Sequence, residues 1–131
     1  MLFICLYMIH HTAIISKKAE IDKEVSIGPY CVIEGSVKIQ KGTKLISHVN
    51  ISGNTQIGQN NNFFPFSSIG LEPQDKKFQG ENSKLIIGNN NIFREHVTIN
   101  PGTKEGGMVT KIENNCLIMI GSHIAHDCFI S

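Results

Sequence analysis

Two histidines near the carboxyl end of the sequence, His123 and His126, have the side chains best suited to proton transfer. An imidazole with an ordinary pKa of about 6.5 can accept a proton at neutral pH, as a general base must. Both histidines lie in the string HIAHDC, in which Asp127 follows His126 directly. A histidine can equally fill a corner of a fold or lie on its surface, so residue type alone leaves both interpretations open.

A second group of candidates is Gln74, Asp75 and Lys77, within the polar string LEPQDKKFQGENSK of residues 71–84. Amide and carboxylate groups can hydrogen-bond hydroxyl groups, and an ammonium group can bind phosphate or stabilise a developing negative charge. The competing interpretation is a solvated polar loop. The position of this segment in the fold must decide between the two.

The elements that position these residues follow from a repeat of six residues. From residue 9 to residue 69 a large apolar residue occupies every sixth position, and a small residue usually follows four positions later. A unit this short cannot bury its apolar residue alone, whereas stacked units can bury it in a central column. We therefore predict an all-β solenoid, with three hexads to each triangular coil. The apolar positions are Ile9, Ile15, Ile21, Ile27, Ile33, Ile39, Leu45, Ile51, Ile57, Phe63 and Ile69.

The repeat is interrupted twice, by residues 71–84 and by residues 100–110, and both segments are predicted to leave the solenoid as loops. Between and after them it resumes, at Ile87, Phe93 and Ile99 and then at Ile112, Ile118, Ile124 and Ile130. We take residues 9–131 as one solenoid domain and residues 1–8 as a non-repeating extension, for which Met8 is an alternative translation start.

The phase of the repeat predicts where the loops and the histidine lie. If each loop replaces one corner, then Ile69, Ile99 and Ile124 fall on the same face of a three-sided solenoid. Each loop leaves just after one of these residues, and His126 stands two positions after Ile124. Both loops and His126 are therefore expected along one edge, which marks that edge as the candidate site.

Five strings in the chain resemble successive signatures of the UDP-N-acetylglucosamine acyltransferases of lipid A synthesis, which are hexapeptide-repeat acyltransferases. The resemblance covers almost all of residues 9–131. It implies that the solenoid is a left-handed parallel β-helix with two protruding loops. The strings are IHHTA (9–13), IGPYCVI (27–33), SIGLEPQDKKFQGE (68–81), IFREHVTINPGT (92–103) and HIAHDC (123–128).

The resemblance also implies a reaction and a role for each candidate. A 3-hydroxyacyl group would pass from the phosphopantetheine thioester of acyl carrier protein to the 3-hydroxyl of UDP-N-acetylglucosamine, without another cofactor. His126 matches the catalytic base, and Gln74, Asp75, Lys77 and His123 match substrate-binding positions. Asp127 would orient the His126 imidazole. Because adjacent side chains on an extended strand point to opposite faces, that contact needs a corner between the two residues. The family places its sites between subunits, so a homotrimer is expected.

Composition excludes several other classes of protein. Twelve Lys and Arg residues stand against 11 Asp and Glu residues, so the chain has no basic stripe for a nucleic acid. The apolar start of the chain is far shorter than the roughly 20 residues of a transmembrane helix. No CxxC pair is present, and three of the four cysteines occupy the small position of the repeat, which predicts reduced thiols in the cytoplasm. The spacing of His96, His123 and His126 differs from that of zinc-binding β-helices, and we predict no metal.

Members of the family are about twice as long as this chain, which matches only their amino-terminal half and ends in the middle of a hexad. We therefore expect a truncated chain, from which the nucleotide-binding residues are missing. Two alternatives stay open beside the O-acyltransferase: another hexapeptide-repeat enzyme, such as the N-acyltransferase of the same pathway, and a noncatalytic β-helix that only assembles or binds.

Overall fold

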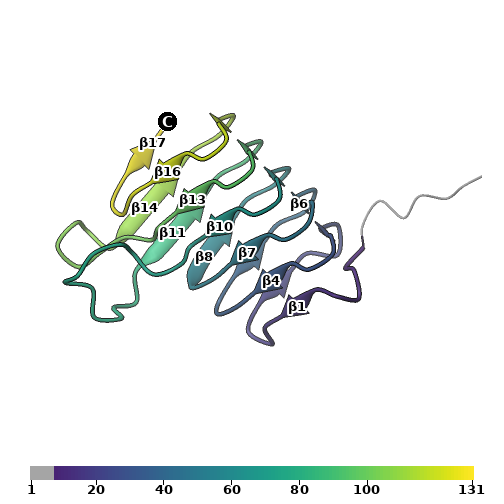
Figure 1. Cartoon of the computed structure of the whole chain (residues 1–131), viewed down its shortest axis with the longest axis horizontal. Helices are drawn as coiled ribbons and strands as arrows, with labels where there is room; N and C mark the ends of the chain where they lie inside the picture. Colours follow the sequence, from purple (N-terminus) through teal and green to yellow (C-terminus); the bar gives the residue numbers. More distant parts are fainter. Residues whose placement is uncertain (1–7) are drawn as a thin grey trace, which may run out of the picture.

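The computed structural model describes residues 8–131, which form a three-sided solenoid of short parallel strands (Figure 1). The predicted extension lies outside the described residues except for Met8, which is exposed. Within residues 8–131 no helix is long and apolar enough to cross a membrane.

Each face of the solenoid is one parallel sheet, and the chain visits the three sheets in turn. The first sheet contains β3 (Ser26–Ile27), β6 (Lys44–Leu45), β9 (Asn62–Phe63), β12 (Ile92–Phe93) and β15 (Leu117–Ile118). The second contains β1 (Ile14–Ile15), β4 (Val32–Ile33), β7 (Asn50–Ile51), β10 (Ser68–Ile69), β13 (Thr98–Ile99) and β16 (His123–Ile124). The third contains β2 (Glu20–Ile21), β5 (Lys38–Ile39), β8 (Asn54–Ile57), β11 (Lys84–Ile87), β14 (Val109–Ile112) and β17 (Phe129–Ile130).

The six-residue repeat corresponds to these strands, because the last residue of each strand is the large apolar residue of a hexad. Ile9 begins the series as an isolated bridge to Ile27. Side chains at the repeat positions point inward and are nearly all inaccessible from Ile27 to Ile112. In the core, the rings of Phe63 and Phe93 stack with their centroids 4.7 Å apart. Most repeat residues of the first and last coils are partly exposed, whereas Ile124 is buried.

The predicted phase is confirmed. Ile69 pairs with Ile99, and Ile99 pairs with Ile124, in adjacent strands of the second sheet. The polypeptide between the second and third sheets therefore forms one edge of the solenoid, from which both loops leave. We call this the loop edge. Figure 1 shows the two loops protruding from the same side of the molecule.

The loops end slightly earlier than the sequence predicts. The first ends before Lys84 and the second before Val109, where β11 and β14 begin. These two strands and β8 are each four residues long, and all four residues of β11 pair with both neighbours. Lateral hydrogen bonding thus extends the strands into residues that the repeat alone assigns to loops.

The corner between the first and second sheets carries a column of side chains at equivalent positions. Tyr30, His48, Phe66 and His96 have φ values of 51° to 67°, the left-handed region that turns the chain. Their rings follow one another, with centroids 5.2, 5.0 and 5.4 Å apart; the first two pairs are tilted by 33° and 32°, and Phe66 stacks on His96. Further apolar side chains project from this corner and from the first sheet. Together the exposed ones form what we call the apolar edge: Tyr30, Ile46, Phe66, Ile92, Leu117, Met119 and Ile120.

Candidate active site

His126 and Asp127 meet at the loop edge, in the turn between β16 and β17. Asp127 has a φ of 63°, so the backbone bends there and the two adjacent side chains come together. His126 Nδ1 lies 2.7 Å from Asp127 Oδ2. The geometric condition for this contact, a corner between the two residues, is therefore met. Because an ionised carboxylate can only accept, the Nδ1 atom carries the proton and Nε2 is left free as an acceptor.

The Asp127 carboxylate is held by Thr103 of the second loop. The Thr103 backbone N–H donates to Asp127 Oδ1 at 2.7 Å, and its hydroxyl donates to Oδ2. The Asp127 N–H in turn donates to Thr110 Oγ1 at 2.8 Å. Although partial burial of Asp127 acts in the opposite direction, the hydrogen bonds from Thr103 and His126 lower the pKa of Asp127 below its ordinary value. The carboxylate is thus fixed and ionised beside the imidazole.

Asn100 joins the two loops. Its side-chain amide donates to the carbonyl oxygens of Leu71 and Glu72 at 3.3 and 3.4 Å, and its Oδ1 accepts from the Gln74 N–H at 3.3 Å. The side chain is almost fully buried. One residue directly after β13 therefore fixes the start of the first loop against the start of the second.

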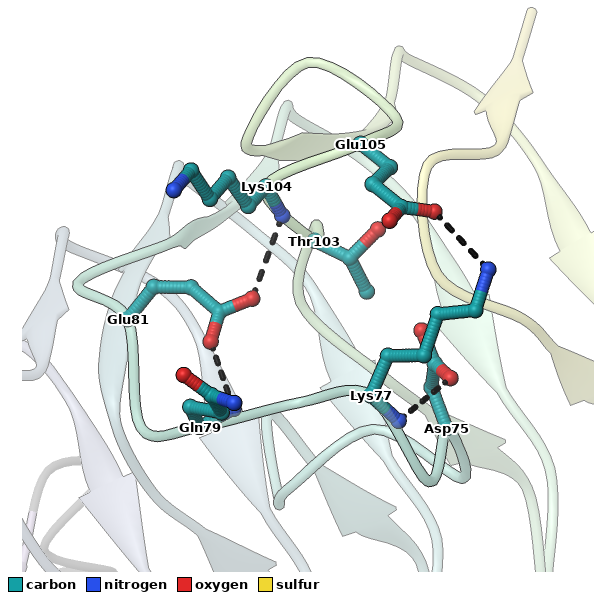
Figure 2. A pocket seen from close by; sticks show the side chains of 7 residues that line it. All are labelled: Asp75, Lys77, Gln79, Glu81, Thr103, Lys104 and Glu105. Carbon is teal, nitrogen blue, oxygen red and sulfur yellow. Dashed lines mark hydrogen bonds and ion pairs between the residues drawn. The ribbon is translucent and has the colours of Figure 1, made fainter.

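The loops enclose a polar pocket of about 360 Å³ (Figure 2). Lys77 Nζ reaches from the first loop to Glu105 Oε2 of the second at 3.2 Å, with both side chains more than 70% exposed. Glu81 accepts from the backbone N–H groups of Gln79 and Lys104 at 2.6 and 3.2 Å. The lining residues are Asp75, Lys77, Gln79, Glu81, Thr103, Lys104 and Glu105. Since Thr103 both lines the pocket and binds Asp127, the pocket adjoins the His126–Asp127 pair.

The structure brings some predicted site residues together and leaves others apart. Asp75 and Lys77 share the pocket, and the Lys77 N–H donates to Asp75 Oδ1 at 2.9 Å. Gln74 is in the same loop, but its side chain is exposed and is not part of the pocket lining. His123 lies on the outer face of β16, where its Nδ1 is 2.7 Å from Thr98 Oγ1. The substrate-binding roles of these four residues and the catalytic role of His126 stay predictions.

Other residues of the site were not predicted individually. Thr103, Asn100 and Glu105 belong to the second loop, which the sequence marks only as an interruption of the repeat. Their partners are 24 to 29 residues away in sequence, so spacing within the loop gives no signal of the contacts. The available signal was the phase of the repeat, which places the loop beside His126.

Among the described residues, no group of three or more His, Cys, Asp or Glu side chains converges as metal ligands would. What the loop edge offers instead is an oriented imidazole beside a polar pocket. Such an arrangement can take a proton from a hydroxyl nucleophile and transfer it to a leaving group, as acyl transfer requires.

The fold is a three-sided parallel β-helix built on hexapeptide repeats, and a histidine–aspartate pair lies at the edge that carries the loops. These two features place the chain in the class of hexapeptide-repeat β-helix proteins. No protein-family model matches the chain. Its curated relatives are acyl-[acyl-carrier-protein]–UDP-N-acetylglucosamine O-acyltransferases. The one from Thermodesulfovibrio yellowstonii is 57% identical over 122 residues, which are 93% of this chain and 47% of the relative. The one from Rickettsia typhi is 50% identical over 120 residues, 92% of this chain and 46% of the relative.

Solved structures agree with this relationship. UDP-N-acetylglucosamine O-acyltransferase from Moraxella catarrhalis superposes with a TM-score of 0.92 at 47% identity, over 93% of this chain and 48% of that one. The Francisella novicida acyltransferase superposes equally well at 45% identity, over 94% of this chain and 45% of that one. The predicted relationship and the left-handed parallel β-helix are therefore confirmed. The chain spans about half the length of the curated relatives it matches.

Proposed function

We propose that this chain takes part in the first step of lipid A synthesis, the transfer of a 3-hydroxyacyl group from acyl carrier protein to the 3-hydroxyl of UDP-N-acetylglucosamine. The names of its relatives give both the carrier protein and the sugar nucleotide. The observation that carries the proposal is the His126–Asp127 pair beside the loop pocket. No cofactor is required beyond the phosphopantetheine thioester of the carrier protein.

In the proposed reaction His126 acts through its free Nε2 atom. This nitrogen takes the proton of the sugar 3-hydroxyl while the oxygen attacks the thioester carbonyl, so that a C–O bond forms. The C–S bond then breaks, and His126 returns the proton to the departing thiolate. Asp127 accepts a hydrogen bond from the His126 Nδ1–H group throughout, stays ionised and stabilises the transient imidazolium. The hydrogen bond keeps Nε2 facing the substrate.

Substrate contacts are assigned to the predicted residues of the first loop and the second sheet. The Lys77 ammonium group suits a phosphate of the sugar nucleotide, while Gln74, Asp75 and His123 suit hydroxyl groups. The ion pair between Lys77 and Glu105 does not prevent this role, because exposed ion pairs contribute only about 0–1 kcal/mol. Lys77 can therefore exchange Glu105 for a substrate phosphate at little cost.

An acyl-transfer assay with the whole chain tests the proposal. The purified protein is mixed with UDP-N-acetylglucosamine and 3-hydroxyacyl carrier protein, and the acylated sugar nucleotide is measured by mass spectrometry. We expect turnover that His126→Ala reduces at least 100-fold. His11→Ala, which removes an exposed histidine from another corner, should retain activity. If the folded protein does not transfer the acyl group, the noncatalytic alternative is favoured. Transfer to an amino sugar instead would favour the N-acyltransferase.

We also propose that the chain forms a homotrimer in the cytoplasm. The apolar edge supports self-association, because exposed apolar side chains are concentrated on one side of the solenoid and Arg94 and Glu95 at the same corner pair with each other at 2.8 Å. Free thiols at Cys31, Cys116 and Cys128 are in keeping with a reducing compartment.

Sedimentation equilibrium measures the assembly directly. We expect a species of three times the 14.5 kDa chain mass. The double variant Phe66→Glu with Met119→Glu should dissociate it, because it places charges on the apolar edge. Phe129→Glu, at a residue that is 69% exposed on the third sheet, is the matched control and should remain trimeric. A wild-type monomer at all concentrations would contradict the trimer.

A further inference from the structure

Thr103 connects the second loop to the proposed catalytic pair by two hydrogen bonds. Its backbone N–H binds Asp127 Oδ1 at 2.7 Å, and its hydroxyl binds Oδ2, the same oxygen that contacts His126 Nδ1. Only 3% of the Thr103 surface is exposed. Both oxygens of the Asp127 carboxylate are thereby engaged, and Thr103 supplies a donor to each.

The loop itself is built to keep Thr103 in place. The Thr103 carbonyl oxygen accepts from the N–H groups of Gly106 and Met108 at 3.2 and 2.8 Å, which closes a tight turn over residues 104–107. Gly106 lies directly against Asp127, since a Cβ atom added there would come within 1.9 Å of the carboxylate carbon. On the other side, the buried Thr110 hydroxyl accepts the Asp127 N–H. The carboxylate therefore sits in a cradle made by the second loop and β14.

Orientation of this carboxylate matters because its terminal torsion is soft. The last side-chain torsion of aspartate has a broad, two-fold profile, so an unrestrained carboxylate can rotate away from the imidazole. In the cradle, the hydroxyl and N–H donors of Thr103 leave one favourable rotation, with Oδ2 facing His126. Fixing Oδ2 keeps the proton on Nδ1 and leaves Nε2 free to accept one.

We propose that Thr103 is a positioning residue, which holds Asp127 and through it fixes the tautomer and direction of the His126 imidazole. The role rests on the acyl-transfer function proposed above. Thr103 acts through Asp127 and makes no contact with reacting atoms. The second loop is then part of the proton-transfer apparatus, and lining the pocket is only one of its functions.

Kinetics of two Thr103 variants test this role. Thr103→Val keeps the shape and the backbone N–H but removes the hydroxyl. We expect kcat to fall about 10- to 100-fold, the range found when a residue that orients a metal-binding histidine is lost. The KM for UDP-N-acetylglucosamine should stay within about twofold, because Thr103 acts on His126. Thr103→Ser restores the hydroxyl and should restore kcat. Thr55→Val, which removes another buried hydroxyl that donates to Ser52 O at 2.7 Å, should leave kcat unchanged.

A spectroscopic readout separates this inference from the function on which it rests. The ¹⁵N chemical shifts of neutral His126 report its tautomer, and wild type should show mainly the Nδ1–H form. Thr103→Val should show a mixture of tautomers, together with a higher pKa of Asp127 because one hydrogen bond to the carboxylate is lost. If wild type transfers no acyl group, the proposed function fails, yet the tautomer still tests the cradle. A wild-type tautomer and kcat in Thr103→Val, or no recovery in Thr103→Ser, would overturn the positioning role.

Discussion

At the residue scale, Asp127 contributes both to the stability of the fold and to the orientation of His126 at the loop edge. Its pKa is lowered in the folded chain, so its contribution to the free energy of unfolding is complete above the ordinary value of 3.8 and is lost as the pH falls through the folded pKa. Asp127→Asn should therefore be less stable than wild type at pH 7, and the difference should shrink as the pH falls below 4. Urea unfolding at a series of pH values measures this. Glu81 and Glu95 also have lowered pKa values, but both residues are present in wild type and in the variant. Their contributions to the pH dependence of the unfolding free energy therefore cancel in the difference. A difference that is independent of pH would contradict the prediction.

Lys77 gives a second prediction at this scale. Lys77→Met should raise the KM for UDP-N-acetylglucosamine about tenfold, because the proposed phosphate contact is lost. Its melting temperature should not change measurably, since the side chain is exposed. Glu105→Gln breaks the same ion pair but keeps the ammonium group, so its KM should equal or fall below that of wild type. Steady-state kinetics of the two variants test whether Lys77 binds the substrate phosphate. An equal rise in KM for both variants would show that the ion pair with Glu105 supports substrate binding and that the phosphate contact does not.

Individual residues were only partly predictable from the sequence. The sequence predicts a contact between His126 and Asp127 if a corner lies between them, and the structure contains this contact. Thr103 could not be found in the same way, because a hydroxyl in a polar loop is ordinary until the loop folds. Its partner lies 24 residues further along the chain, and nothing local in the sequence encodes that distance.

At the element scale, the stack of Phe63 in β9 and Phe93 in β12 shows how neighbouring coils stabilise each other. Both side chains are fully buried, and their rings lie nearly parallel at 8°. Phe93→Ala should cost about 3–5 kcal/mol of unfolding free energy, because it leaves a cavity in a column that cannot collapse. Phe129→Ala, on the exposed outer face of β17, should cost less than about 0.5 kcal/mol. Equilibrium urea unfolding of the pair measures the difference, and similar losses in both variants would contradict the assigned core.

The elements were far more predictable than the loops. Stacked coils of three hexads bury the large apolar residues in one column, so the register Ile69 to Ile99 to Ile124 could be counted from the sequence on the condition that each loop replaces one corner, which the structure shows. The ends of the loops could not be counted in this way. They depend on lateral pairing of β11 with β8 and β14, and hydrogen bonds between backbones do not depend on which side chains are present.

At the scale of the whole molecule, the solenoid makes contacts almost entirely between adjacent coils. The free energy of unfolding of such a chain is close to the sum of the stability of each coil and of each interface between adjacent coils. The end coils therefore open more readily than the middle ones. The repeat residues follow this gradient: Ile51 and Ile69 are fully buried, while Ile15 and Ile130 are only partly buried. The residues of the proposed site span the coils from the first loop to the carboxyl end. The His126–Asp127 pair relies on the second loop, because Thr103 of that loop holds the Asp127 carboxylate.

Cysteine reactivity can measure this gradient along the molecule. Cys31 is fully inaccessible, and burial raises the pKa of its thiol although hydrogen bonds to the backbone partly offset the effect. Cys116 and Cys128, in the last coils, are only partly buried.

Because the thiolate is the reactive form, iodoacetamide at pH 8 should alkylate Cys116 and Cys128 well before Cys31. Timed quenching and peptide mass spectrometry resolve each site, with Cys5, outside the described residues, quantified separately. Cys31 should react faster only at urea concentrations that unfold the whole solenoid, and labelling of Cys31 as fast as Cys116 in native protein would contradict the gradient.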